Sequence, residues 1–183
     1  MLRQKYCCRL LAPEFAAVGT AHRGKEWQVV LAHPLVLPDL PGWEQASQQL
    51  LALVNATRAS ARRCGDAAFG PAAPLAWNPR LAQAALAHSD DMAERHYFEH
   101  RQPDGSEPAD RATRAGYRWR LVGENIASGQ RTPQEAMVAW LDSPGHCANI
   151  MNPRFAEMGA AYAINPRNDN RTPFWTQLFG TPR

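Results

Sequence analysis

Three predicted helix starts combine a capping side chain with a proline at the next position. Asn78-Pro79, Thr132-Pro133 and Ser143-Pro144 each supply a side-chain oxygen for the free N–H groups of a helix start, and a ring whose φ is already helical. Thr132 is also followed three residues later by Glu135, the spacing of a capping box. These signals predict three helices with fixed starts, the last one short because Asn152-Pro153 stops it.

Hydrophobic periodicity predicts the remaining elements. Apolar residues from Trp43 to about Arg62 recur at helical spacing, and the helix from Asn78 carries an apolar face that includes His88. We expect His88 to be a hydrogen-bonded core residue. The other expected elements are a short helix over 108–115, strands over 26–32, 121–128, 157–165 and 174–180, and irregular segments over 1–25 and 65–74. Because the helices come first and two strands come last, the pattern predicts an α+β fold with helices packed on an antiparallel sheet.

The length of 183 residues suits one domain, which we place at 43–183 behind an N-terminal extension over 1–42. The extension begins with basic residues and a short apolar piece that Pro13 and Glu14 interrupt, the pattern of a degraded export signal followed by one strand. No stretch approaches the roughly 20 apolar residues of a membrane span. The net charge is +3 with no run of like charges, so we expect no nucleic-acid partner.

Four polar residues are candidates for chemistry. His100 and His146 each lie at a junction beside turn-forming residues, and Glu124 and Asp142 are the acids that could accompany them. Two histidines with one or two carboxylates could hold zinc, with His100 and His146 as ligands, although the spacing matches no known zinc motif. A cysteine-protease pair of Cys147 with a distant histidine is a further alternative.

Cysteine spacing bears on that alternative. Cys64 and Cys147 are the two cysteines inside the patterned region, and a disulfide between them would close a loop of about 80 residues. Such a bond would stabilise the fold by about 4 kcal/mol in the chain-entropy model and would indicate an oxidising compartment. Two independent buried thiols are the alternative. Cys7 and Cys8 lie outside this region, and we assign them no role.

Seven segments taken in order resemble one family. They are HSDDMA (88–93), YFEHRQPDG (97–105), DRATRAGY (110–117), GENIASGQ (123–130), AWLDSPGHCANIMNP (139–153), EMGAAYA (157–163) and FWTQLFG (174–180). Together they are similar to a bacterial CAP-superfamily domain, the group that includes plant pathogenesis-related-1 and cysteine-rich secretory proteins. The resemblance covers roughly residues 44–181.

The resemblance implies an α-β-α sandwich with a central antiparallel sheet, a secreted or periplasmic location, and a Cys64–Cys147 disulfide. It also implies a cleft that contains His100 from FEH, Glu124 from GEN and His146 from SPGH. The family's fourth cleft group, a glutamate three residues after the tryptophan equivalent to Trp140, is Ser143 here, so Asp142 is the candidate substitute.

Two functions from different classes are consistent with this cleft. The first is a non-enzymatic, monomeric module that binds a small apolar or sterol-like lipid ligand or a partner protein and requires no cofactor. The second is a zinc-assisted hydrolase in which His100 and His146 hold the metal and Glu124 is the general base. A third interpretation gives these residues a purely structural role. We favour the binding module.

Overall fold

The computed structural model describes residues 17–32, 40–165 and 171–183. The chain divides after residue 38 into two compact units. The predicted export-signal remnant and the pair Cys7 and Cys8 lie outside the described residues. Within the described residues, no helix is both long enough and apolar enough to cross a membrane.

The described part of the first unit is a two-stranded antiparallel ribbon. Its strands are β1 (Ala17–Arg23) and β2 (Glu26–Ala32), joined by a tight turn in which Gly24 has a φ of 59°. The strand predicted over 26–32 is confirmed, but the expectation that residues 1–25 are irregular is wrong for β1. The small residues of β1 obscure its alternation of apolar and polar positions, so the sequence does not indicate a strand there. The strand forms because β1 pairs with β2 across the turn.

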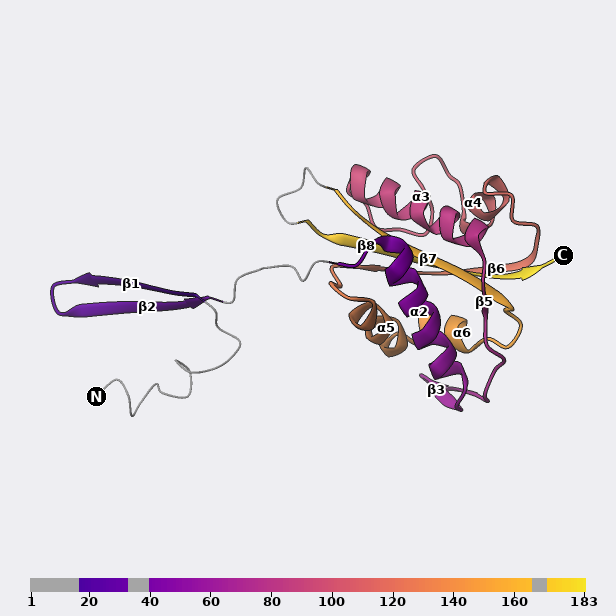
Figure 1. The fold of residues 1–183 in the computed structure, drawn as a ribbon, viewed down its shortest axis with the longest axis horizontal. Coiled ribbons are helices and arrows are strands. Elements are labelled where there is room, and N and C mark those ends of the chain that lie inside the picture. Colours follow the sequence, from indigo (N-terminus) through magenta and orange to yellow (C-terminus); the bar gives the residue numbers. More distant parts are fainter. Residues whose placement is uncertain (1–16, 33–39, 166–170) are drawn as a thin grey trace. The chain divides into compact units, whose positions relative to one another are not determined.

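The second unit contains five helices and six strands among its described residues (Figure 1). The helices are α2 (Trp43–Arg58), α3 (Pro79–Arg95), α4 (Pro108–Arg114), α5 (Pro133–Asp142) and α6 (Pro144–Met151). The strands are β3 (Arg62–Cys64), β4 (Ala67–Phe69), β5 (Ala76–Trp77), β6 (Trp119–Ser128), β7 (Glu157–Ile164) and β8 (Pro173–Pro182).

The helix starts lie where the capping signals predicted them. The Asn78 side chain accepts hydrogen bonds from the N–H groups of Arg80 and Leu81, and the Thr132 hydroxyl accepts from the N–H of Glu135. The Ser143 side chain forms no capping hydrogen bond, although α6 still begins at Pro144. Proline at the first turn is therefore a sufficient start signal for α6.

The central sheet has the strand order β5-β7-β8-β6. The β7–β8 and β8–β6 pairs are antiparallel, which confirms the predicted α+β fold, whereas the two-residue β5 pairs with β7 in parallel. The loop expected over 65–74 is partly a second small hairpin of β3 and β4, whose turn contains Gly65 with a φ of 59°. Strands of two or three residues carry too little periodicity to be predicted.

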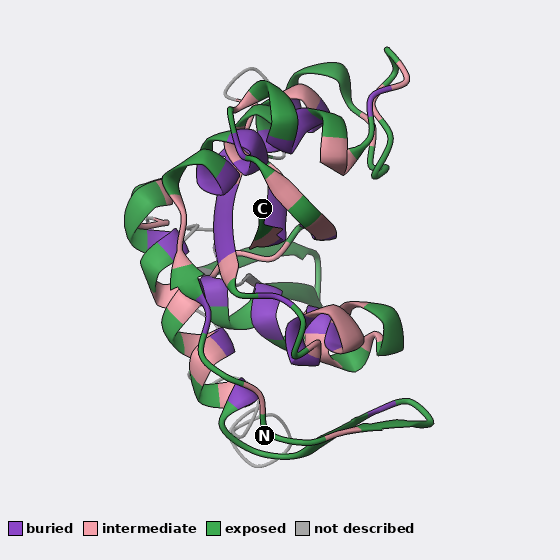
Figure 2. Cartoon of the chain, turned by 90° about the vertical axis from the view of Figure 1, so that its right-hand side faces the viewer, coloured by how far each residue is buried: buried purple, intermediate pink, exposed green. Residues whose placement is uncertain are grey.

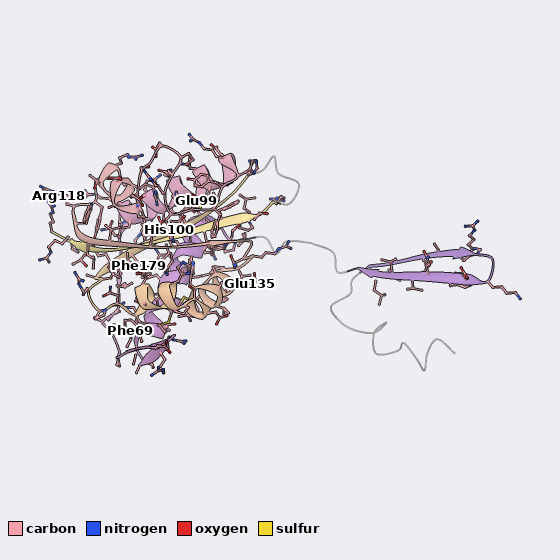
Figure 3. The ribbon with its side chains drawn as sticks, turned by 180° about the vertical axis from the view of Figure 1, so that it is seen from behind. Phe69, Glu99, His100, Arg118, Glu135 and Phe179 are labelled. Carbon is pink, nitrogen blue, oxygen red and sulfur yellow. A yellow bond between two sulfur atoms is a disulfide. The ribbon has the colours of Figure 1, made fainter. Side chains whose placement is uncertain are left out.

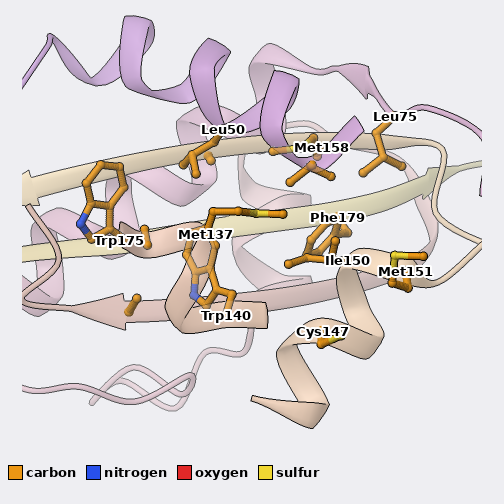
Figure 4. Packing of buried hydrophobic residues seen from close by; sticks show 14 of the residues in the cluster. Leu50, Leu75, Met137, Trp140, Cys147, Ile150, Met151, Met158, Trp175 and Phe179 are labelled. Carbon is orange, nitrogen blue, oxygen red and sulfur yellow. The ribbon is translucent and has the colours of Figure 1, made fainter. Parts of the chain in front are cut away.

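Helices cover both faces of the sheet and form a three-layer sandwich (Figure 1). On one face, α2, α5 and α6 enclose a core with Trp140, Trp175 and Phe179 (Figure 4). On the other face, α3 and α4 pack over Leu178 and Ala161. Consecutive residues of β8, Leu178 and Phe179, point to opposite cores, as strand geometry requires. Figure 2 shows the buried residues concentrated where the helices meet the sheet.

Candidate functional site

The site is centred on the carboxylate of Glu124, which lies in the middle of β6 and is buried. Its Oε1 lies 2.8 Å from Nδ1 of His100, in the segment that connects α3 to α4. The His100 side chain is 48% exposed, whereas that of Glu124 is 1% exposed. An ionised carboxylate only accepts hydrogen bonds, so His100 Nδ1 carries the proton, and in the neutral ring Nε2 is an acceptor. Figure 3 labels His100 beside Glu99.

The second carboxylate oxygen is held by Arg111 of α4. Its Nη2 donates to Glu124 Oε2 at 2.6 Å and to the carbonyl of His100 at 2.9 Å, while Nη1 donates to the carbonyl of Ser106 at 3.2 Å. The Arg111 side chain is 3% exposed. Arg111 therefore neutralises Glu124 inside the protein and also fixes the backbone of the segment that carries His100.

Sequence reasoning missed Arg111. No signal in the sequence indicated it, because only the packing of α4 against β6 shows that this face of the helix is buried. A charged residue on a packed helix face implies a buried partner, because an unpaired charge there is strongly unfavourable.

His88 holds the segment that carries His100. It lies on α3 with no exposed surface, and its Nε2 donates to the carbonyl of Glu99 at 3.0 Å. Burial lowers the pKa of His88 to about 4, so the ring is neutral at physiological pH. The expectation of a hydrogen-bonded core histidine is confirmed. Nδ1 of His88 has no hydrogen-bond partner among the described residues.

His146 reaches the same region from the first turn of α6. The ring centroids of His146 and His100 lie 6.3 Å apart. Burial lowers the pKa of His146, and the neighbouring His100 lowers it further. The structure thus brings together three of the four predicted cleft residues, with His100 between Glu124 and His146.

Several contacts fix α6 in place. Asn149 donates from Nδ2 to the carbonyl of Glu124 at 3.1 Å, and Asn125 donates from Nδ2 to the carbonyl of His146 at 3.2 Å. The Cys64–Cys147 disulfide joins α6 to β3 with a Cα–Cα distance of 5.5 Å, which confirms the predicted pairing. Because Cys147 is in this disulfide, it has no free thiol for the cysteine-protease alternative.

The buried side chain of Arg58 holds the other end of α6. Its Nη1 donates to the carbonyls of Ile150 at 2.7 Å and Asn152 at 3.0 Å. A cation at this position interacts favourably with the negative end of the helix dipole. His146 is therefore presented by a helix that is anchored at both ends.

Asp142 lies elsewhere. It is exposed at the end of α5 and lines a hollow of about 500 Å³ together with Gln130, Glu135 and Val138. Within the described ranges, no hydrogen bond or ion pair links Asp142 to His100, Glu124 or His146. One residue along a helix turns a side chain by about 100°, so the family's glutamate position and Asp142 face different directions. Ser143, which occupies that position, is the residue preceding α6.

A shallow hollow of about 320 Å³ opens beside His100 and Glu124. Its other walls are Glu107, Pro108, Ala109, Val122 and Gly123. The hollow combines a small apolar surface with an imidazole and the edge of a neutralised carboxylate. Its volume lies near the lower end of the range for small-molecule sites, so it suits one end of a ligand rather than a large molecule.

The donor set does not fit a zinc centre that includes Glu124. Both carboxylate oxygens already accept hydrogen bonds, and the Arg111 cation lies 2.6 Å from one of them, which opposes a divalent ion electrostatically. Across the described ranges, no group of three or more His, Cys, Asp or Glu side chains is arranged to hold a metal ion. His100 Nε2 and the His146 ring are the two remaining nitrogen donors of the cluster.

The chain belongs to the cysteine-rich secretory protein family, whose family model matches residues 51–179. This match confirms the resemblance that the ordered motifs indicated.

This chain matches only part of the length of individual relatives. The uncharacterized protein YkwD from Bacillus subtilis (strain 168) is 39% identical over 106 residues, which are 58% of this chain and 39% of that protein. A solved extracellular protein containing a SCP domain from Bacillus anthracis is 30% identical with a TM-score of 0.63, over 84% of this chain and 46% of that chain. This chain therefore spans less than half of the length of either relative.

More distant structures agree in fold. An outer surface protein from Borrelia burgdorferi is 18% identical with a TM-score of 0.61, over 76% of this chain and 95% of that chain. At this identity the likeness concerns the fold alone.

Proposed function

We propose that this protein is a non-catalytic extracellular binding module whose cleft takes the hydroxyl end of a small amphipathic ligand. The observation that carries the proposal is the state of Glu124: one carboxylate oxygen accepts from His100 and the other from Arg111. A carboxylate engaged in this way is a structural centre for the cleft rather than a free base.

This arrangement disfavours the hydrolase interpretation. A general base must lie within hydrogen-bond reach of the water that it deprotonates. Glu124 has 1% of its side chain exposed, and its charge is paired with a cation that is itself buried. With so little exposed surface and a buried cation beside it, Glu124 is poorly placed to deprotonate a water molecule.

The chemistry of the ligand follows from the tautomer of His100. With Nδ1–H donated to Glu124, the neutral ring offers Nε2 as an acceptor from its exposed side. A hydroxyl group can donate to that nitrogen, whereas a carboxylate has no proton to donate and would accept from Nε2–H only if the ring were protonated. The apolar walls Pro108, Ala109 and Val122 suit a hydrocarbon body next to the hydroxyl. A sterol or a long-chain alcohol has this combination of groups.

The proposed location rests on two observations. The buried Cys64–Cys147 disulfide belongs to oxidising compartments. The solved Bacillus anthracis relative is described as extracellular. An extracellular or periplasmic location accounts for both.

The proposal is tested with three probes that have one chain length: 1-octanol, octane and octanoate. Binding to the full chain is followed by NMR of ¹⁵N-labelled histidine side chains, which reports directly on Nε2. We expect 1-octanol to bind about fivefold more tightly than octane, the equivalent of one net hydrogen bond of about 1 kcal/mol. Octanoate should bind less tightly than 1-octanol at neutral pH.

His100→Phe keeps a ring but removes the acceptor, so it should abolish the preference for the alcohol. Gln83→Ala, at an exposed position of α3, is the control and should leave the preference unchanged. Equal binding of 1-octanol and octane by the unmodified protein would refute the proposed chemistry. Ester or peptide hydrolysis that disappears in Glu124→Gln, with the fold retained, would establish the hydrolase instead.

A further inference from the structure

Four exposed arginines from three segments of the chain meet at one end of the sheet. Arg118 and Arg120 flank the start of β6, Arg183 follows the end of β8, and Arg154 lies in the turn before β7. The N–H of Arg183 donates to the carbonyl of Arg118 at 3.1 Å, and the hydroxyl of Thr181 donates to the carbonyl of Arg154. Figure 3 labels Arg118 at this end of the domain, which the C-terminus marks in Figure 1.

Two of these side chains are held by a reciprocal pair of hydrogen bonds across the strands. Nε of Arg120 donates to the carbonyl of Pro182 at 2.9 Å, and Nε of Arg183 donates to the carbonyl of Trp119 at 2.9 Å. Because the bonds use Nε, the terminal nitrogens of both guanidinium groups remain without a partner among the described residues. Each group is thus oriented in advance and presents donors to solvent.

The positive charge at this end is not neutralised locally. In the part of the chain that the structure describes, none of the four arginines has a carboxylate within ion-pair distance. Glu157 lies nearby in the register, opposite Gly180, but among the described residues it forms no ion pair with these arginines; its carboxylate accepts a hydrogen bond from the hydroxyl of Tyr117 at 2.7 Å. The fold therefore brings together arginines from three separate parts of the sequence.

We propose that this face, defined as Arg118, Arg120, Arg154 and Arg183, binds a linear polymer of phosphate groups. Guanidinium groups match the geometry of phosphate oxygens and stay charged at all relevant pH values. The four groups are exposed and enclose no cavity for a single anion. A chain that repeats its charges would engage several of them at once and gain affinity through multivalency.

The surroundings favour this ligand over a lipid bilayer or a nucleic acid. Among the described residues of the second unit, the large exposed apolar side chains that could enter a bilayer are Phe98 and Val138, which belong to other segments than the four arginines. Proteins that bind single-stranded nucleic acids typically present aromatic rings for base stacking beside their basic groups. The aromatic residue at this end, Trp119, is partly buried and donates from its indole to Thr113 at 2.9 Å.

The test measures binding of fluorescently labelled inorganic polyphosphate to the full chain by anisotropy over a series of salt concentrations. We expect affinity to fall linearly with salt on a log–log plot, as counterion release requires. Arg120→Gln/Arg183→Gln should weaken binding about tenfold and reduce the salt slope by about two, since each lost phosphate contact lowers the slope by about one. Arg62→Gln/Arg63→Gln, at exposed positions of β3, changes the net charge equally and should have little effect.

Three results would overturn the proposal. The first is the absence of salt-dependent polyphosphate binding, and the second is equal weakening in both double variants. The third is binding to anionic phospholipid vesicles or to a single-stranded oligonucleotide that is tighter than binding to polyphosphate of equal charge. The first result leaves the cleft at His100 untouched, so this proposal and the proposed function can fail separately.

Discussion

Replacing Glu124 with glutamine tests how the site is built. The substitution removes the negative charge but keeps the shape of the side chain, and it leaves the Arg111 cation 3% exposed inside the protein. The remaining acceptors of Arg111 are the carbonyls of Ser106 at 3.2 Å and His100 at 2.9 Å. Breaking a buried ion pair by removing one partner costs about 3–5 kcal/mol. We therefore expect Glu124→Gln to lose about that much of a free energy of unfolding on the order of 5–15 kcal/mol.

Urea unfolding followed by tryptophan fluorescence measures this loss. Arg111→Met/Glu124→Gln removes both charges and should recover most of the stability that Glu124→Gln loses. Arg114→Gln is the control, because it breaks an exposed ion pair with Asp104 and should cost less than about 1 kcal/mol. If Glu124→Gln lost no more than Arg114→Gln, the carboxylate would not be the structural centre of the cleft. A stable Glu124→Gln protein would then be compatible with a catalytic role for Glu124.

Three further predictions concern stability. Cys64→Ser/Cys147→Ser should lower the free energy of unfolding by about 4.5 kcal/mol, measured with urea under oxidising conditions, because the disulfide closes a loop with a sequence separation of 83. A loss below about 1 kcal/mol would contradict this expectation. Burial lowers the pKa of His88 to about 4 from 6.5, so the unfolded chain takes up the proton first as pH falls. The free energy of unfolding should therefore drop by up to about 3 kcal/mol between pH 7 and pH 4, and His88→Gln should remove this contribution. If the free energy of unfolding of His88→Gln fell with pH in parallel with that of the unmodified protein, the prediction would be wrong. Gly159→Ala should lower the melting temperature strongly, because its Cβ would lie 2.1 Å from the backbone nitrogen of Ala82; an unchanged melting temperature would show that α3 can shift.

Local signals predicted the parts of the fold that are encoded locally. The starts of α3 and α5 follow from Asn78 and Thr132, whose side chains cap them within three residues. The final strands were predictable because β7 and β8 are long enough to show their alternation. The position of the disulfide followed from the family resemblance rather than from spacing, which left two free thiols as an alternative.

The electrostatics of the site depend on contacts that no local pattern contains. Arg111 and Glu124 are 13 residues apart, and their pairing depends on how α4 packs beside β6. The same reason applies to the arginine face, where Arg120 and Arg183 are brought together by the β6–β8 register. His100 was predictable as a cleft residue, but its tautomer was not, since the tautomer is set by the carboxylate that it contacts.

We propose that Glu124 is committed to Arg111 and His100, and that the cleft therefore binds an organic ligand rather than a metal. Calorimetric titration of the full chain with zinc, with His100→Ala/His146→Ala as the control, tests it most directly. We expect no tight one-to-one binding, and weak heats that are the same in the control variant. Tight one-to-one binding that disappears in His100→Ala/His146→Ala would contradict this proposal and would make the cleft a metal site.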